Sequence, residues 1–550
     1  MNENKKNSSI AIFGVVFAVI IVLVLGILLV FKMSSKGKTV ESMMKHIDVT
    51  SAEPVKASIS LDDNSLYDEL PEITKYPLAV ETSADIVIEV MTSPEKAGKD
   101  YESWFIDVAE KFNKEEKTTA GGQTIGVNVR SVSSGLAADY IISNKHTPEM
   151  FSPSNSLWGE YVNANGGDVT IVKDRLVGNT AGLLIDKKLS YKTFDDIISA
   201  VQGGSLNIGY TNPQSSSTGM NLLLSILYAG DSESMFSDAA VENFTKFQNN
   251  IPFVAYNTMQ MRDSAQKGTL DGMIMEYQTY VNEENINKIY DFVPFGVRHD
   301  NPLYIVNEAY LTDDKVEAVN IFADYCMEDS CQKIATKYGF NANDDYKPEM
   351  SFSGSEVNKA LEMYKANKDN GKDIIAVFVA DCSGSMFGDP MDQLKQSLSN
   401  GMQYINENNY VGLVSYSDDV TIEVPIAKFD MNQKAYFQGG INGLNANGST
   451  ASYDAIVVAM DMIQKELVNH PDAKPMIFLL SDGKQNVGYN FGTIKSSLSE
   501  SKIPVYTISY TSDGDKDAMQ ELADLNEGAS INADSDDIIY KIKSLFNSQM

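Results

Sequence analysis

Five oxygen-bearing side chains, spread over three distant segments, form the set most able to do chemistry. They are Asp381, Ser383, Ser385, Thr450 and Asp482. The first three make a D-x-S-x-S pattern, the threonine closes a Gly-Ser-Thr turn, and the last aspartate precedes a glycine. Two carboxylates and three hydroxyls give an all-oxygen set of low charge, which suits a hard divalent cation such as Mg²⁺. The set predicts a metal site.

Two short apolar runs, 374–380 and 476–480, must position the aspartates. Short apolar runs bounded by turn residues are typical of buried strands in a parallel sheet. Ligands collect at the carboxyl ends of such strands. We therefore expect Asp381 and Asp482 to lie at one edge of an α/β sheet.

The three segments, in this order, resemble the metal-ion-dependent adhesion site (MIDAS) of the von Willebrand factor A (VWA) family. The resemblance covers residues 373–550. It implies a doubly wound, Rossmann-like domain that holds a divalent cation, with Mg²⁺ favoured and Mn²⁺ or Ca²⁺ also open. It further implies a protein partner that offers an acidic residue to the cation.

Hydroxyl-rich turns precede two helix-like segments in the middle of the chain, at 133–135 and 215–219. A helix N-terminus presents unpaired N–H groups and the positive end of the helix dipole. Such turns either bind a ligand or merely cap their helices, because Ser and Thr are common caps.

The order of these turns, together with the segments 152–155 and 268–277, resembles the type II group of bacterial extracellular solute-binding proteins. The resemblance covers residues 85–345 and implies two periplasmic-binding-protein-like α/β lobes that close on a small polar solute. The candidate ligand-binding residues are Ser133, Ser134, Ser154, Ser217, Thr218, Glu276 and Tyr277. The carboxylate of Glu276 would repel a bare oxyanion, so cationic, amine-bearing and peptide-like solutes stay open beside anions. A domain that has lost its ligand and contacts proteins is a further alternative.

Residues 10–31 contain no charged side chain and are mostly apolar. At about 1.5 Å per residue they would reach roughly 33 Å as a helix, enough to cross a bilayer. We expect a single membrane-spanning signal anchor after a short cytoplasmic tail (1–9), then a polar stalk (32–84). A linker is expected at 346–372, between the two domains. The extracellular type of the middle domain places both domains outside the cell membrane.

The chain carries 75 acidic and 44 basic residues, a net charge of −31. This balance argues against nucleic-acid binding, which depends on Lys and Arg neutralising phosphates. Cys326 and Cys331 either form a bridge or remain free thiols.

These features favour a membrane-anchored bacterial surface binding protein that is not an enzyme. It would have a divalent-cation site for contact with a protein and a cleft for a solute. The alternative is the substrate-binding component of an ABC-type transporter. A metal-chelatase-like or hydrolytic subunit is less favoured, because no G-x-S-x-G or Cys/His arrangement is present.

Overall fold

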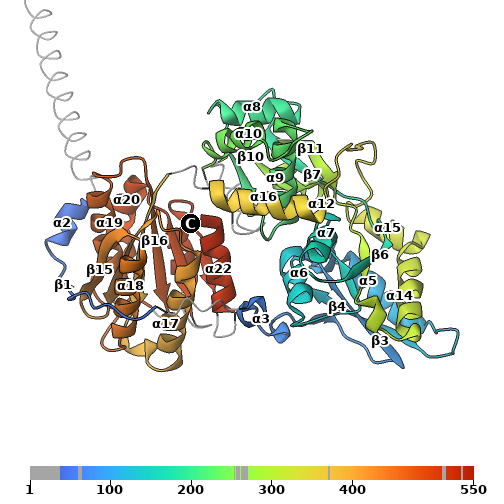
Figure 1. Cartoon of the computed structure of the whole chain (residues 1–550), viewed down its shortest axis with the longest axis horizontal. Helices are drawn as coiled ribbons and strands as arrows, with labels where there is room; N and C mark the ends of the chain where they lie inside the picture. Colours follow the sequence, from blue (N-terminus) through green and yellow to red (C-terminus); the bar gives the residue numbers. More distant parts are fainter. Residues whose placement is uncertain are drawn as a thin grey trace, which may run out of the picture.

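Three α/β bodies, each built on its own sheet, make up the computed structural model (Figure 1). It describes residues 38–59, 65–252, 254–255, 261, 270–368, 372–482, 484–510, 516–533 and 537–549. The predicted anchor at 10–31 lies outside these residues. No helix within the described ranges is long and apolar enough to span a bilayer.

The C-terminal body is a seven-stranded sheet in the order β1-β15-β14-β13-β16-β17-β18. The strands are β1 (Val49–Ser51), β13 (Ile374–Asp381), β14 (Tyr410–Tyr416), β15 (Val420–Lys428), β16 (Lys474–Ser481), β17 (Val505–Ser509) and β18 (Ser530–Asn532). Neighbouring strands are parallel except β14 and β15. Every residue of the central strand β13 is buried, which explains its unbroken apolar run.

Helices cover both faces of this sheet, as expected for a doubly wound domain. One face packs against α17 (Asp389–Gly401), α18 (Met431–Gly443) and α22 (Ile538–Gln549). The other packs against α2 (Val40–Met44), α19 (Ser452–Glu466), α20 (Phe491–Ser501) and α21 (Lys516–Asp524). The core is dense: the rings of Phe378 and Phe478 stack on neighbouring strands with centroids 4.9 Å apart.

The start of the described chain belongs to this body, so the predicted stalk at 32–84 is wrong for this part. The apolar residues Val40, Met43 and Ile47 recur at helical spacing and are buried in the core beneath α19. Strand β1 extends the sheet by pairing in parallel with β15. Because the two lobes occupy the sequence between, they are an insertion within the C-terminal body.

The other two bodies are the predicted lobes. The first-lobe sheet has the order β2-β4-β3-β5-β12-β6 and the second β11-β7-β10-β8-β9. The first comprises β2 (Leu78–Val80), β3 (Ile86–Thr92), β4 (Ile125–Ser131), β5 (Met150–Ser152), β6 (Val169–Lys173) and β12 (Leu303–Val306). The second comprises β7 (Thr180–Asp186), β8 (Ile208–Thr211), β9 (Val254–Ala255), β10 (Gly272–Glu276) and β11 (Tyr290–Arg298).

Helices flank both lobe sheets. The first lobe carries α4 (Pro94–Ala97), α5 (Trp104–Glu115), α6 (Ser134–Ser143), α7 (Leu157–Ala164), α14 (Asp313–Cys326) and α15 (Asp329–Lys337). The second carries α8 (Phe194–Gln202), α9 (Ser217–Gly230), α10 (Asp238–Gln248), α12 (Tyr277–Asn282) and α13 (Glu284–Asn287). The chain crosses between the lobes at 174–179, after β6, and at 299–302, after β11. These two crossovers form the hinge.

The predicted linker at 346–372 is instead largely a packed helix, α16 (Gly354–Asn367), which lies along the lobes in Figure 1. Val357, Ala360 and Tyr364 bury one side of it in the core shared with α7 and α9. A capping box at Ser353 and Glu356 begins the helix. Cys326 and Cys331 are buried free thiols, not a bridge.

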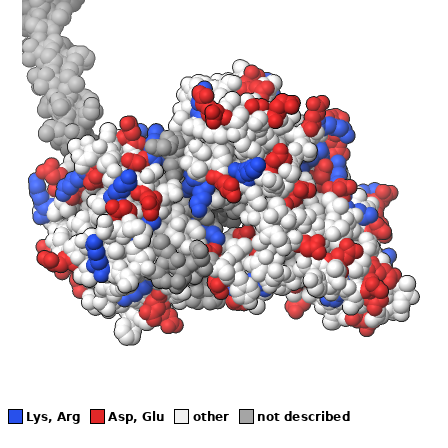
Figure 2. All heavy atoms as spheres, in the orientation of Figure 1, with Lys and Arg blue, Asp and Glu red and all other residues white. Residues whose placement is uncertain are grey.

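The lobes also touch the C-terminal body. Glu69, in the short helix α3 (Leu66–Glu69), accepts hydrogen bonds from the Tyr404 hydroxyl and from Lys543 of α22. The Gln549 amide donates to the carbonyl of Val254 at 2.9 Å. On the face seen in Figure 2, acidic and basic side chains are interspersed, which is typical of a solvated surface.

Candidate metal site and interlobe cleft

Asp381 ends β13 at the rim of the seven-stranded sheet, and its side chain is fully buried. One carboxylate oxygen accepts the backbone N–H of Ser383 at 2.8 Å. The other accepts the hydroxyls of Tyr416 at 3.0 Å and Ser481 at 2.5 Å. Hydrogen bonds to its ionised form therefore hold this buried carboxylate in one orientation.

The predicted side chains around Asp381 form a hydrogen-bonded chain. The Ser383 and Ser385 hydroxyl oxygens are 3.1 Å apart, and Ser385 donates to Asp482 at 2.8 Å. Burial, followed by the charge of Asp381, raises the pKa of Asp482, and the bond from Ser385 opposes that shift. A divalent cation would relieve the repulsion between the two carboxylates.

The loop that carries Thr450 is hydrogen-bonded to the loop that carries Ser383 and Ser385. The N–H of Gly384 donates to the carbonyl of Gly448 at 3.0 Å, which ties the D-x-S-x-S turn to the Gly-Ser-Thr turn. Gly448 has φ +71°, a conformation that glycine adopts without strain. The N–H of Thr450 donates to the side chain of Asn486 at 2.8 Å. All five predicted residues thus lie at one rim of one sheet.

The donor set fits a hard cation with few charged ligands. It has two carboxylates and three hydroxyls, and the described ranges contain no group of three or more His, Cys, Asp or Glu that could hold a metal ion. The buried hydroxyls of Ser383 and Thr450 add neutral oxygens, which Mg²⁺ and Mn²⁺ accept alongside water.

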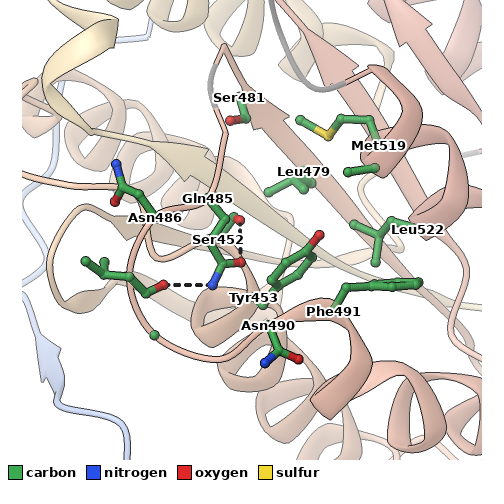
Figure 3. Close-up of a pocket in the computed structure, with 13 residues that line it drawn as sticks. Ser452, Tyr453, Leu479, Ser481, Gln485, Asn486, Asn490, Phe491, Met519 and Leu522 are labelled. Atoms are coloured by element: carbon green, nitrogen blue, oxygen red, sulfur yellow. Dashed lines mark hydrogen bonds between the residues drawn. The ribbon is translucent and has the colours of Figure 1, made fainter.

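A cavity of about 350 Å³ opens beside this rim (Figure 3). Leu479, Tyr453, Phe491, Met519 and Leu522 gather on one side of it, and Gln485, Asn486 and Asn490 lie opposite. Its lining reaches Ser481, which contacts Asp381, so the cavity adjoins the candidate metal site.

A second cavity, of about 480 Å³, lies between the two lobes. Six of the seven predicted ligand-binding residues line it: Ser133, Ser134, Ser154, Ser217, Thr218 and Glu276. Tyr277 is not among its lining residues, because its ring packs against Phe292 and Tyr280 with centroids 5.0 and 5.9 Å away. Tyr277 is therefore part of the apolar packing of the second lobe.

The two predicted turns meet across this cleft. A Cβ atom on Gly135 would lie 3.0 Å from the Cα of Ser215, so only glycine permits the approach. The Trp158 indole of the first lobe donates to the Ser217 hydroxyl at 2.9 Å. Ser216 of the predicted 215–219 turn caps α9, because its hydroxyl accepts the N–H of Gly219.

Several lining residues were missed from the sequence. Glu95 and Ser93 follow β3 in a strand–turn–helix unit of the kind used to find the other turns, so a signal was available. Tyr540, Lys541 and Ser544 come from α22 of the C-terminal body. No local signal connects that helix to a cleft more than two hundred residues earlier in the chain.

Glu95 and Glu276 are two of the three carboxylates in the described lining of the cleft. Glu95 accepts the Ser154 hydroxyl at 2.5 Å and lies 3.7 Å from the fully buried Nζ of Lys96. Burial lowers the pKa of Lys96 to about 8, although Glu95 opposes that shift. Glu276 contacts Nδ1 of His299 at 2.8 Å and accepts the Asn179 amide at 2.5 Å. Asn179 and His299 stand on the two hinge crossovers.

Comparison with known proteins agrees with this division. Residues 376–546 match the von Willebrand factor type A domain family, and residues 97–341 match the bacterial extracellular solute-binding protein family. The inter-alpha-trypsin inhibitor heavy chain H3 of Bos taurus is 26% identical over 174 residues, which cover 29% of this chain and 19% of that protein. The match thus spans about a fifth of that relative's length.

Two solved structures resemble separate parts of the chain. A von Willebrand factor type A protein from Catenulispora acidiphila has a TM-score of 0.30 and 18% identity, covering 32% of this chain and 42% of that one. The sulfate-binding protein SubI from Mycobacterium tuberculosis has a TM-score of 0.35 and 16% identity, covering 47% of this chain and 88% of that one. The two family matches show that the chain combines a bacterial extracellular solute-binding protein domain with a von Willebrand factor type A domain.

Proposed function

We propose that this chain is a non-enzymatic binding protein with two sites. A divalent cation at the rim of the VWA sheet contacts an acidic group of a protein partner. The interlobe cleft takes a small polar solute. The single observation that carries the proposal is the hydrogen-bonded chain from Ser383 through Ser385 to Asp482, beside the buried Asp381.

The rim residues would offer the cation two kinds of oxygen ligand. Ser383, Ser385 and Thr450 would offer neutral hydroxyl oxygens, and Asp381 and Asp482 would offer charge directly or through water. With Asp381 and Asp482 both ionised, the two carboxylates just balance a divalent cation, so the loaded site carries no excess negative charge to repel a further anionic ligand. A bound cation supplies an electrophilic centre for a further oxygen ligand, and a carboxylate from a partner matches that need.

The cleft supports the solute part of the proposal. Its volume of about 480 Å³ falls within the range of small-molecule sites, roughly 300–1,000 Å³. It lies between two lobes joined by two crossovers, an arrangement that permits hinge closure on a ligand. We further propose that residues 10–31 anchor the chain in the cell membrane with both domains outside. That apolar stretch in the sequence supports the anchor.

Calorimetry with Mg²⁺ and Mn²⁺ on the whole chain tests the metal site. Asp381→Asn should remove binding and keep the fold, because the amide replaces the carboxylate isosterically and the hydroxyls of Tyr416 and Ser481 can turn to accept from it. Asp461→Ala is the matched control, since Asp461 pairs with Lys465 along α19, three turns from the rim. Equal affinity in Asp381→Asn and the control would refute the site.

A further inference from the structure

The described lining of the cleft carries more acidic than basic side chains. Its described lining includes three carboxylates, on Glu95, Glu102 and Glu276, and one ammonium group, on Lys541. Lys541 is already paired with Asp537 on its own helix at 2.5 Å. Among the described residues, the next positive charge is that of Lys96, whose ammonium group lies just behind the cleft wall.

Lys96 serves Glu95. Its ammonium group is fully buried and donates to the Ser93 hydroxyl at 2.6 Å and to Asn301 at 2.9 Å. It lies within ion-pair distance of Glu95, and the described residues show no such pair between a lysine or arginine and Glu276. Lys96 is thus paired directly with Glu95, one of the three carboxylates of the lining, and acts on Glu276 only from beyond ion-pair distance.

The neighbouring amide of Asn221 fixes which ring nitrogen of His299 accepts a hydrogen bond. The Asn221 oxygen accepts the N–H of Val297 at 2.9 Å and its nitrogen donates to the Val297 carbonyl at 2.8 Å, which fixes the orientation of the amide. That nitrogen lies 3.2 Å from Nε2 of His299, and the Asn155 nitrogen lies 3.0 Å from it. Because the Asn221 nitrogen can only donate, Nε2 of His299 accepts from it and Nδ1–H donates to Glu276.

Glu276 accepts hydrogen bonds from two side chains and, within the described residues, has no lysine or arginine at ion-pair distance. Nδ1–H of His299 and the amide of Asn179 donate to it, and its side chain is only 12% exposed. Burial, and next the charge of Glu95, raise the pKa of Glu276, while His299 and Lys96 oppose that shift. The remaining polar lining is hydroxyl groups, which can accept N–H bonds as readily as donate.

We propose that the interlobe cleft binds an organic ammonium ion against Glu276 and excludes oxyanions; this rests on the proposed function of the cleft as a solute site. The ammonium group supplies the missing positive charge, and hydroxyls such as Ser133 and Thr218 accept its other N–H groups. Leu136, Ile274 and Met275 line the same cavity and would contact the carbon skeleton. A cavity of about 480 Å³ suits such a molecule better than a bare metal ion.

The test is calorimetry on the whole chain, purified in mild detergent, with putrescine, spermidine and L-lysine against sulfate, phosphate and molybdate. We expect saturable binding of at least one amine and of none of the anions. The diol with the carbon chain of putrescine is a neutral control and should not bind. Oxyanion binding, or equal binding of diol and amine, would overturn this inference and leave the solute cleft standing. If none of these compounds binds, the proposed function of the cleft as a solute site would be overturned, and this inference with it.

A variant pair checks the assigned carboxylate. Glu276→Gln should weaken amine binding by about tenfold or more, because a charge-assisted hydrogen bond becomes a neutral one. Glu110→Gln, on the exposed side of α5, should leave the affinity unchanged. Thermal melting confirms that both variants fold. Unchanged amine affinity in folded Glu276→Gln would contradict the assignment, and if that variant does not fold, the comparison of diol with amine decides.

Discussion

The rim site and the interlobe cleft hold their carboxylates in different ways. At the rim, Asp381 ends β13 and Asp482 directly follows the neighbouring strand β16, so their spacing is set by backbone pairing. In the cleft, Glu276 is held by Asn179 and His299, which stand on the two hinge crossovers. The rim is therefore preformed, whereas the carboxylate of the cleft is held by the two crossovers between the lobes. A charged ligand at Glu276 would act directly on these crossovers, while a cation at the rim would act on a rigid edge.

The largest effect is expected from removing the N-terminal segment from the VWA sheet. A fragment of residues 372–550 should be less stable by about 4 kcal/mol or more than the same fragment with 38–57 fused to it, because Val40, Met43 and Ile47 lose their burial. Urea denaturation of the two fragments measures the difference. Equal midpoints would show that α2 and β1 add nothing to the sheet.

The next effect concerns the rim alone. Asp482→Asn should lower Mn²⁺ affinity by about a hundredfold, since it removes one of two ligand charges, and should leave amine binding in the cleft unchanged. Titration of both ligands on one preparation measures this. A parallel loss of amine affinity would mean that the two sites are coupled.

Asp139 lies near the contact between the first lobe and the VWA domain, and its protonation should affect stability. Burial raises the pKa of Asp139 to about 7, with Lys543 opposing the shift. Its folded pKa exceeds the unfolded value of 3.8, so the folded state holds the proton more tightly and this contribution to stability fades as pH rises from about 4 through 7. Asp139→Asn should be more stable than the native chain at pH 8 by on the order of 2 kcal/mol, and nearly equal to it below pH 4. Denaturation across this pH range gives the answer, and parallel curves would refute the assignment.

The smallest effect is expected where the lobes meet the VWA domain. Tyr404→Phe removes the hydroxyl that donates to Glu69 and should destabilise the whole chain by about 1 kcal/mol. Tyr436→Phe, at a tyrosine on α18 of the same domain, is the control. If both variants melt together with the native chain, the contact at Glu69 contributes no stability.

The rim site and the cleft also differ in how far the sequence predicts them. Asp381 and Asp482 end apolar runs that could only be buried strands, so their shared edge was predictable. The lobes were predictable from their turns, and six of the seven proposed residues do line one cavity. Tyr277 was misplaced because it follows Glu276 directly, and only the packing of Phe292 shows that its ring points elsewhere.

The remaining errors come from contacts distant in the sequence. Val40, Met43 and Ile47 form an apolar helix face, but their partners lie some four hundred residues later, so the segment was taken for a stalk. The approach of α22 to the cleft depends on how the VWA domain docks. That docking rests on single contacts such as Lys543 with Glu69, which no periodicity reveals.

The divalent-cation site at the rim of the VWA sheet can be tested by locating Mn²⁺ in crystals of the chain through its anomalous scattering. We expect one strong peak at this rim, surrounded by Asp381, Ser383, Ser385, Thr450 and Asp482. A peak elsewhere, or none at this rim under saturating Mn²⁺, would contradict it.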